Sequence, residues 1–177
     1  MASPAIACVG IIGRHNNPLH VSLFPPHTGT EIEFSLLLSS TLDIFESRLP
    51  QKTADQDLGL LQALDERLAC YGWATNTGVK FVIVVDMAGR PDSGNLAGRN
   101  SASGLIGLRD ADLKPAFKAL QTAYIRLLQN PFYNPDEHSP LAQMHGGRTG
   151  NMQITSKRFI NEVDRVGKAW APGVTNL

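Results

Sequence analysis

The sequence predicts an α+β fold with three layers, in which one helix covers one face of a five-stranded, mainly antiparallel sheet and two helices cover the other. Residues 5–13 and 79–87 are apolar at nearly every position, as central strands covered on both faces require. Short polar links separate the other strand-like runs, which favours antiparallel neighbours. A strand order of 2-1-5-4-3 satisfies both observations, because it places the two wholly apolar strands side by side.

The first two strands are expected to form a hairpin. Polar turn residues follow strand 5–13, and the segment 18–24 then alternates apolar and polar side chains, which indicates an edge strand. The apolar side of this second strand holds Leu19, Val21 and Leu23, and the polar side holds His20 and Ser22.

The first helix is predicted over residues 31–49. One face repeats apolar residues at steps of three and four, and Pro50 ends the helix. That face consists of Phe34, Leu38, Leu42, Phe45 and Leu49. At helical spacing the neighbours of Asp43 are the serines 39, 40 and 47, so Asp43 lies on a polar face while Leu42 points to the sheet.

Three strands follow at 58–65, 67–76 and 79–87, with a hairpin turn before the third in which Gly78 is free to take positive φ. The next segment, 88–108, is rich in Gly, Ser and Asn and poor in apolar residues. It indicates a flexible surface insertion, which is long for a compact domain.

The second helix begins at about Asp112, a suitable N-cap, with Pro115 in its opening turn. Its apolar face consists of Leu113, Phe117, Leu120, Tyr124, Leu127 and Leu128. The helix stops at 130–135, where two prolines restrict the residues before them and fix the direction of two aromatic side chains. We expect Phe132 to fill the core and Tyr133 to contact a partner.

The last helix is predicted over about 151–169, after a flexible link at about 136–150 and before a loose tail from about Ala171. Its apolar face consists of Met152, Phe159, Val163, Val166 and Trp170. Residues 1–177 contain neither an internal repeat nor a second hydrophobic pattern, so we expect a single domain.

Composition argues against several classes of function. The chain has 16 basic and 16 acidic residues and a net charge of zero, so we expect no nucleic-acid partner and only indirect contact with a membrane. Acidic residues prevail in the first half and basic ones in the second, which suits a protein that docks between two neighbours. Cys8 and Cys70 lie in apolar runs and indicate buried thiols in a reducing, cytoplasmic compartment.

Several strings in this order and spacing resemble the sedlin family, the longin-like subunits of the TRAPP vesicle-tethering complex, and within it the branch called subunit 2-like. The strings are 7–13 (ACVGIIG), 17–19 (NPL), 41–46 (TLDIFE), 71–76 (YGWATN), 79–86 (VKFVIVVD) and 130–135 (NPFYNP). The insertion, the link and the tail depart from the family pattern and inherit no role from it.

The resemblance implies a longin-like, profilin- or SNARE-like fold and a non-catalytic subunit of a tether that acts as the exchange-factor assembly for a Rab-type GTPase. Such a subunit is cytoplasmic and peripheral to Golgi and endosomal membranes, in ER-to-Golgi and endosomal traffic, and its partners are other TRAPP subunits. The Leu-Asp pair that the family ties to partner contact is Leu42 and Asp43 here. Sedlin itself and other longin-type trafficking subunits stay alternatives.

Enzymatic readings find little support, and we expect no catalytic residue, cofactor or metal. His145 and the two glycines after it are similar to an esterase oxyanion segment, but no Gly-x-Ser-x-Gly elbow accompanies them. The glycines of the insertion lack the Gly-Lys-Ser/Thr of a phosphate-binding loop. His15, His20 and His27 straddle a hairpin and a Pro-Pro bend, which is poor spacing for a metal site. The alternative is a small-molecule enzyme that uses the insertion as a lid, and deleting 91–105 would then abolish turnover.

Overall fold

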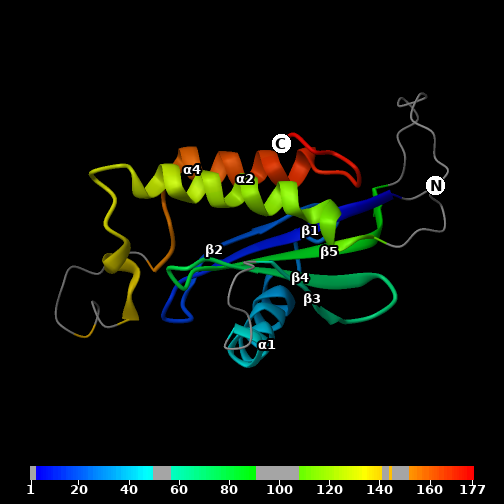
Figure 1. Ribbon diagram of the computed structural model, residues 1–177, viewed down its shortest axis with the longest axis horizontal. Coiled ribbons are helices and arrows are strands. Elements are labelled where there is room, and N and C mark those ends of the chain that lie inside the picture. The colour runs from blue at the N-terminus through cyan, green and yellow to red at the C-terminus, as the bar shows by residue number, and fades with distance from the viewer. Residues whose placement is uncertain (1–2, 50–56, 91–107, 141–143, 145–151) are drawn as a thin grey trace.

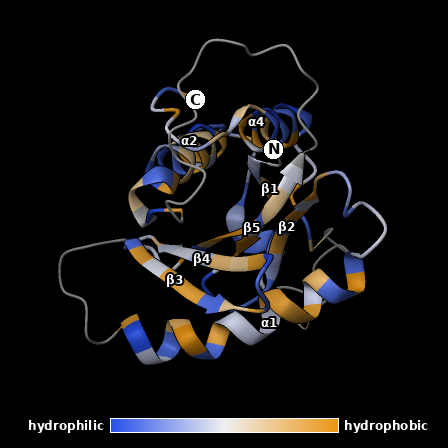
Figure 2. Ribbon diagram, turned by 90° about the vertical axis from the view of Figure 1, so that its right-hand side faces the viewer, coloured by the Kyte–Doolittle hydropathy of each residue, from blue (hydrophilic) through white to orange (hydrophobic). Residues whose placement is uncertain are grey.

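The computed structural model describes residues 3–49, 57–90, 108–140, 144 and 152–177. The sheet forms the middle layer, with helix α1 on one face and helices α2 and α4 on the other (Figure 1). A view turned by 90° shows α1 alone on its side of the sheet and α2 and α4 next to each other (Figure 2). The predicted α+β, longin-like arrangement of layers is therefore confirmed.

The five strands are joined in the order β2-β1-β5-β4-β3, and every neighbouring pair is antiparallel, as predicted. The two strands that are apolar on both faces, β1 and β5, lie next to each other because only inner positions bury both faces of a strand. The bounds are β1 Ser3–Ile12, β2 Pro18–Leu23, β3 Asp57–Ala63, β4 Leu68–Ala74 and β5 Lys80–Arg90.

β5 is longer than the sequence indicates. It continues to Arg90, which pairs with Ser3 of β1, so residues 88–90 of the predicted insertion belong to the strand. The rest of that insertion, 91–107, lies outside the described residues. The turn before β5 is as predicted: Gly78 has φ +83°, and the backbone N–H of Thr75 donates to the carbonyl of Val79 at 2.8 Å.

The helices are α1 Glu31–Arg48, α2 Asp110–Leu128 and α4 Lys157–Ala169, with a short 3₁₀ helix, η2, at Pro135–His138. Asp112 is not the N-cap of α2. The helix begins at Asp110, and the carboxylate of Asp112 accepts a hydrogen bond from the backbone N–H of Arg109 at 3.1 Å. The side chain therefore caps the helix from inside its first turn.

α4 also begins later than its apolar pattern predicts. Met152 is exposed, and Asn151 lies outside the described residues. Ile154 is buried, and its backbone N–H donates to the carbonyl of Leu19 at 2.8 Å. The chain thus pairs briefly with the edge of β2 before α4 begins at Lys157.

The predicted link and the predicted tail both contain residues that contact the rest of the fold. In the predicted link, residues 136–138 belong to η2, and Asn17 holds this helix by donating to the carbonyl of His138 at 2.8 Å. The other described residues of the link are 139, 140 and 144. In the predicted loose tail, Leu177 packs against the hydrophobic cluster beneath α2 and α4.

Two hydrophobic clusters lie on the two faces of the sheet. The larger one joins the sheet to α2 and α4 and contains Phe81, Phe117 and Val163. The smaller one joins the sheet to α1 and contains Cys8, Phe45 and Cys70. Leu49 does not belong to the buried face of α1, because the helix ends at Arg48 and leaves Leu49 exposed.

α4 covers the face of β2 that the sequence assigns to polar residues. His20 is buried there, packs edge-on against Phe159 and forms a hydrogen bond of 2.8 Å with Ser22. Ser22 in turn donates to Asp164 of α4 at 3.2 Å. The pairing of β1 with β2 shifts register next to Leu19, which puts Leu19 in the cluster beneath α4, away from Val21.

Candidate partner-binding surface

α1 is held close against the sheet along its length. Its buried side chains Phe34, Leu37, Leu38, Thr41 and Phe45 face the sheet. Gly10 of β1 permits the close approach, since a Cβ at this position would lie 2.6 Å from Cδ2 of Leu38. The buried hydroxyl of Thr41 donates to the carbonyl of Leu38 at 2.7 Å and so leaves no unpaired polar group in the contact.

A buried carboxylate fixes the segment that leads into α1. Asp86 of β5 is 1% exposed and accepts hydrogen bonds from Arg67 at 2.8 and 2.9 Å and from the backbone N–H of Ala88 at 2.9 Å. His27 Nε2 lies 2.8 Å from the same carboxylate, and the His27 ring packs edge-on against Phe34 of α1. The Asp86 carboxylate therefore ties β4 and β5 to the entry of the helix.

The pKa of Asp86 reflects two opposing effects. Burial raises it, but the hydrogen bonds from Arg67, His27 and Ala88 outweigh burial and hold the pKa well below the usual range of an aspartate. The group is therefore ionised in the folded protein at neutral pH.

The other end of α1 is tied to β3 and to the β1–β2 turn. Arg48 donates to the carbonyl of Leu60 in the edge strand β3 at 2.6 Å. Asn16 donates to Glu46 at 3.0 Å and accepts from the ammonium group of Lys80 at 2.7 Å. Burial lowers the pKa of Lys80, against the opposite effect of Glu46. α1 is thus fixed to the sheet at both ends.

The outer face of α1 carries two large apolar side chains without cover from the described residues. Ile32 is 78% exposed and Leu36 is 67% exposed. Further along the same helix Asp43 is exposed, as are the serines 39, 40 and 47, whereas Leu42 is half-buried against the smaller cluster. The structure therefore places Leu42 inward and Asp43 outward, as their spacing indicates.

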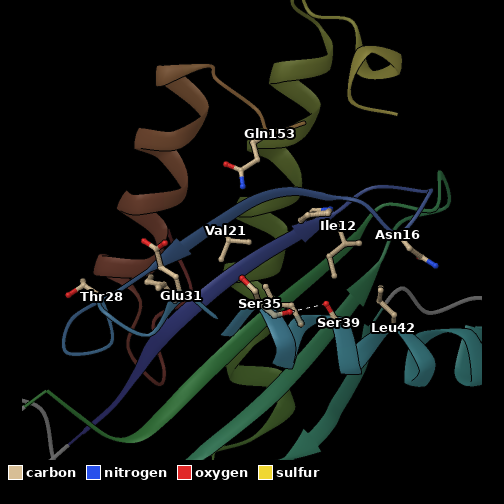
Figure 3. Close-up of a pocket in the computed structure, with 12 residues that line it drawn as sticks. Ile12, Asn16, Val21, Thr28, Glu31, Ser35, Ser39, Leu42 and Gln153 are labelled. Atoms are coloured by element: carbon tan, nitrogen blue, oxygen red, sulfur yellow. Dashed lines mark hydrogen bonds between the residues drawn. The ribbon is translucent and has the colours of Figure 1, made fainter. Parts of the chain in front are cut away.

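A groove of about 520 Å³ separates α1 from the edge strand β2 (Figure 3). Val21 lines it from β2, while Ser35, Ser39 and Leu42 line it from α1. Glu31, in the first turn of α1, is the one charged residue among those that line it in the described part of the chain. This groove was not predicted from the sequence, although the alternation of 18–24 and the serines of α1 are signals for it.

At the turn 130–135 the structure overturns one expectation, the placement of Phe132 in the core. Phe132 is 95% exposed and does not fill the core. Tyr133 is half-buried, packs against the larger cluster and lies 5.5 Å from His138 between ring centroids. Its hydroxyl is buried without a hydrogen-bond partner among the described residues, and burial raises its pKa. Asn130 fixes the turn, because its side chain accepts from the N–H of Phe132 and its carbonyl from that of Tyr133.

The three histidines considered as catalytic or metal-binding residues each make different contacts. His20 lies beneath α4, His27 binds Asp86 and His15 accepts a hydrogen bond from Arg14. Within the described ranges, no group of three or more His, Cys, Asp or Glu side chains has the arrangement of a metal site. Residues 101, 103 and 145–147 lie outside those ranges. Among the helices in the described ranges, none is both long and apolar enough to cross a membrane.

Comparison with known proteins finds one family and several relatives. A family model described as sedlin matches residues 11–169. The chain is 33% identical over 166 residues to the trafficking protein particle complex subunit 2-like protein of Dictyostelium discoideum, covering 89% of this chain and 93% of the relative. It is 32% identical over 136 residues to the proteins of the same name from Bos taurus and Mus musculus, covering 73% of this chain and 84% of each relative.

Proposed function

Because the chain belongs to the sedlin family, we propose that it serves as a subunit of a trafficking protein particle complex and acts through contacts with other proteins. The relatives with that name support the proposal, since the alignment spans 93% of the protein from Dictyostelium discoideum and 84% of those from Bos taurus and Mus musculus. The same reading assigns no reaction to this chain itself.

In its finer form the proposal places the chain in a TRAPP assembly that tethers vesicles and promotes nucleotide exchange on a Rab-type GTPase. The direct partners are then other TRAPP subunits, and the GTPase and the membrane are met only by the assembly. The expected location is the cytoplasmic side of Golgi and endosomal membranes, in ER-to-Golgi and endosomal traffic. These details rest on the family resemblance.

The outer face of α1 is the observation that carries the proposal. Large apolar side chains on a rigid helix bind a partner at a low entropic cost, because the helix is ordered before binding. Ile32 and Leu36 are such side chains, and the helix that holds them is tied to the sheet at both ends. We propose that Asp43 extends this contact at its polar end and that Leu42 supports it from the inner side of the helix.

The turn at 130–135 is the second surface that we assign to partners. Phe132 stands exposed at this turn, and part of the Tyr133 ring stays accessible beside it. A partner that covers Phe132 would therefore meet Tyr133 as well. A contact to Tyr133 alone is less favourable, since its hydroxyl is already buried.

Co-purification of the tagged chain with the other subunits of its complex tests the proposal. Asp43→Tyr adds bulk on the exposed face of α1, so we expect recovery of partners to fall at least about fivefold with an unchanged circular dichroism spectrum. Glu66→Tyr, in the exposed turn between β3 and β4, is the matched control and should keep full recovery. Undiminished recovery with Asp43→Tyr and with Ile32→Ser/Leu36→Ser would contradict the assigned surface.

A further inference from the structure

β2 leaves part of its backbone unpaired at the edge of the sheet. The N–H of Phe24 donates to Ala7 of β1 at 2.8 Å, and in a strand the backbone groups of successive residues point to opposite sides. Val21 and Leu23 therefore direct their N–H and C=O groups away from β1. Neither residue has a backbone hydrogen-bond partner on that side within the described ranges. Such an edge is a template for another extended chain.

The chain itself already uses one end of this edge. The N–H of Ile154 donates to the carbonyl of Leu19 at 2.8 Å, from a segment that then turns away into α4. The adjoining Gln153 lies over the groove (Figure 3). An extended segment can thus approach β2 at hydrogen-bonding distance, and among the described residues no second segment pairs with the edge beyond Leu19.

The groove next to this edge can take the side chains of an added strand. Val21 and Leu23 are half-buried on the side of the sheet that faces α1, and both pack beside the smaller cluster. A strand paired with β2 would turn alternate side chains toward Leu42 and the small side chain of Ser35. The volume of about 520 Å³ leaves room for apolar side chains at these positions.

The charge of Glu31 determines which end of a bound segment should carry a cationic side chain. Glu31 is the one charged residue that lines the groove in the described part of the chain, and it lies at the end near Thr28, away from Asn16 and Leu42 (Figure 3). A cationic side chain at that end of the bound segment would complement it. An acidic segment would instead face uncompensated repulsion there.

We propose that the groove between β2 and α1 binds an extended segment of a partner protein by strand addition to β2, with Lys or Arg at the end facing Glu31 and apolar residues at alternate positions. Main-chain hydrogen bonds to Val21 and Leu23 would provide affinity, and the groove would provide specificity for the side chains of the segment. Leu42 is common to both proposals, but Ile32, Leu36 and Asp43 do not line the groove. Peptide titration and co-purification therefore test different contacts, and each proposal can fail alone.

Peptide titration of the ¹⁵N-labelled full chain, followed by NMR, tests strand addition without any complex. The probes are two capped peptides, one alternating Val with Thr and one alternating Leu with Thr, each with an N-terminal Lys. We expect the amides of Val21 and Leu23 to shift and to become protected from hydrogen exchange. N-methylation of the central residues removes their N–H donors to the Val21 and Leu23 carbonyls and places a methyl group against β2. These peptides should therefore not pair with β2 and should give no protection.

Charge is tested with a matched pair of variants. Glu31→Gln should weaken binding of the Lys peptides about threefold to fivefold, as expected for a partly exposed ion pair. Glu33→Gln, on the same helical turn but outside the groove, should leave affinity unchanged. Three results would overturn the proposal: no response of Val21 and Leu23 to either peptide, equal protection by the N-methylated peptides, or a response confined to the opposite edge strand β3.

Discussion

Arg67, the residue before β4, and Asp86 of β5 meet through two parallel hydrogen bonds, from Nε to Oδ1 at 2.8 Å and from Nη2 to Oδ2 at 2.9 Å. The carboxylate is buried while half of the Arg67 side chain stays exposed. This two-point pairing fixes the geometry of both side chains as well as their charge. It also lies next to His27, at the entry of the helix that carries the proposed partner surface.

Acid should weaken the protein through Asp86. Because the folded-state pKa of Asp86 is depressed, its contribution is fully present above the ordinary aspartate pKa of about 4 and is lost as pH falls toward the folded-state value. Urea unfolding measured between about pH 6 and pH 2 should therefore show a falling free energy of unfolding. Asp86→Asn should cost about 2 kcal/mol at pH 7 and flatten this dependence.

Asp43→Asn is the control for the acid measurement, since Asp43 is exposed on α1. It should leave both the stability at pH 7 and the pH dependence unchanged. A wild-type slope in Asp86→Asn would mean that other carboxylates carry the acid sensitivity.

The sheet could be predicted from sequence because its signals are local and repeated. Residues 5–13 and 79–87 are apolar on both faces, and that pattern alone makes them inner neighbours. The turn at 130–135 could not be resolved in the same way. Its prolines restrict the backbone, but consecutive residues in a turn have no fixed period, so the sequence does not say whether Phe132 or Tyr133 faces the core.

The candidate site was only partly visible in the sequence. The helical period places Asp43 outward and Leu42 inward, and the structure agrees. The groove and the Asp86 cluster depend on residues far apart in the chain, such as His27 and Arg67, and no spacing rule relates them. The one signal for the cluster is the charged Asp86 directly after the apolar run 81–85.

Gly167 should resist replacement because α4 packs closely on the segment after β2. An added Cβ would overlap the ring of Phe24, which is itself buried. Alanine favours a helix over glycine by about 1 kcal/mol, but overpacking in a dense core costs about 1–3 kcal/mol. We expect the clash to outweigh propensity, so Gly167→Ala should lower the free energy of unfolding by up to about 2 kcal/mol in a urea titration.

Gly29→Ala is the matched control for that substitution, since among the described residues no heavy atom beyond its two chain neighbours lies within 4 Å of the added Cβ. Its stability should change by less than about 0.5 kcal/mol. A stabilised Gly167→Ala protein would show that Phe24 moves aside without loss of packing.

Substitution of Phe132 and of Tyr133 tests which aromatic side chain of the turn contributes to the core. Phe132→Ala should change stability by less than about 0.5 kcal/mol, since the side chain is 95% exposed. Tyr133→Phe should preserve or raise stability by up to about 1 kcal/mol, because it removes a buried hydroxyl that lacks a hydrogen-bond partner among the described residues. Thermal unfolding of both variants checks the assignment, and a large loss for Phe132→Ala would return that ring to the core.

Cys8 and Cys70 report on the cluster between the sheet and α1. Both thiols are free and fully buried, on the strands that flank β5. Burial raises the pKa of Cys8, and it raises the pKa of Cys70 to about 12. Since the thiolate is the reactive form, a disulfide reagent at pH 8 should label either thiol at least about 100-fold more slowly than an exposed cysteine.

Both thiols should react rapidly once the protein is unfolded in guanidinium. This control shows that slow labelling of the native protein comes from burial and not from chemical modification of the thiols. Cys8→Ser and Cys70→Ser, each with one thiol left, assign the rates to single positions. If α1 leaves the sheet only on global unfolding, both variants should be labelled at rates set by the free energy of unfolding, and Asp86→Asn should raise the two rates together. Fast labelling of one thiol in the native protein would instead reveal that α1 opens locally, which would contradict a helix fixed at both ends.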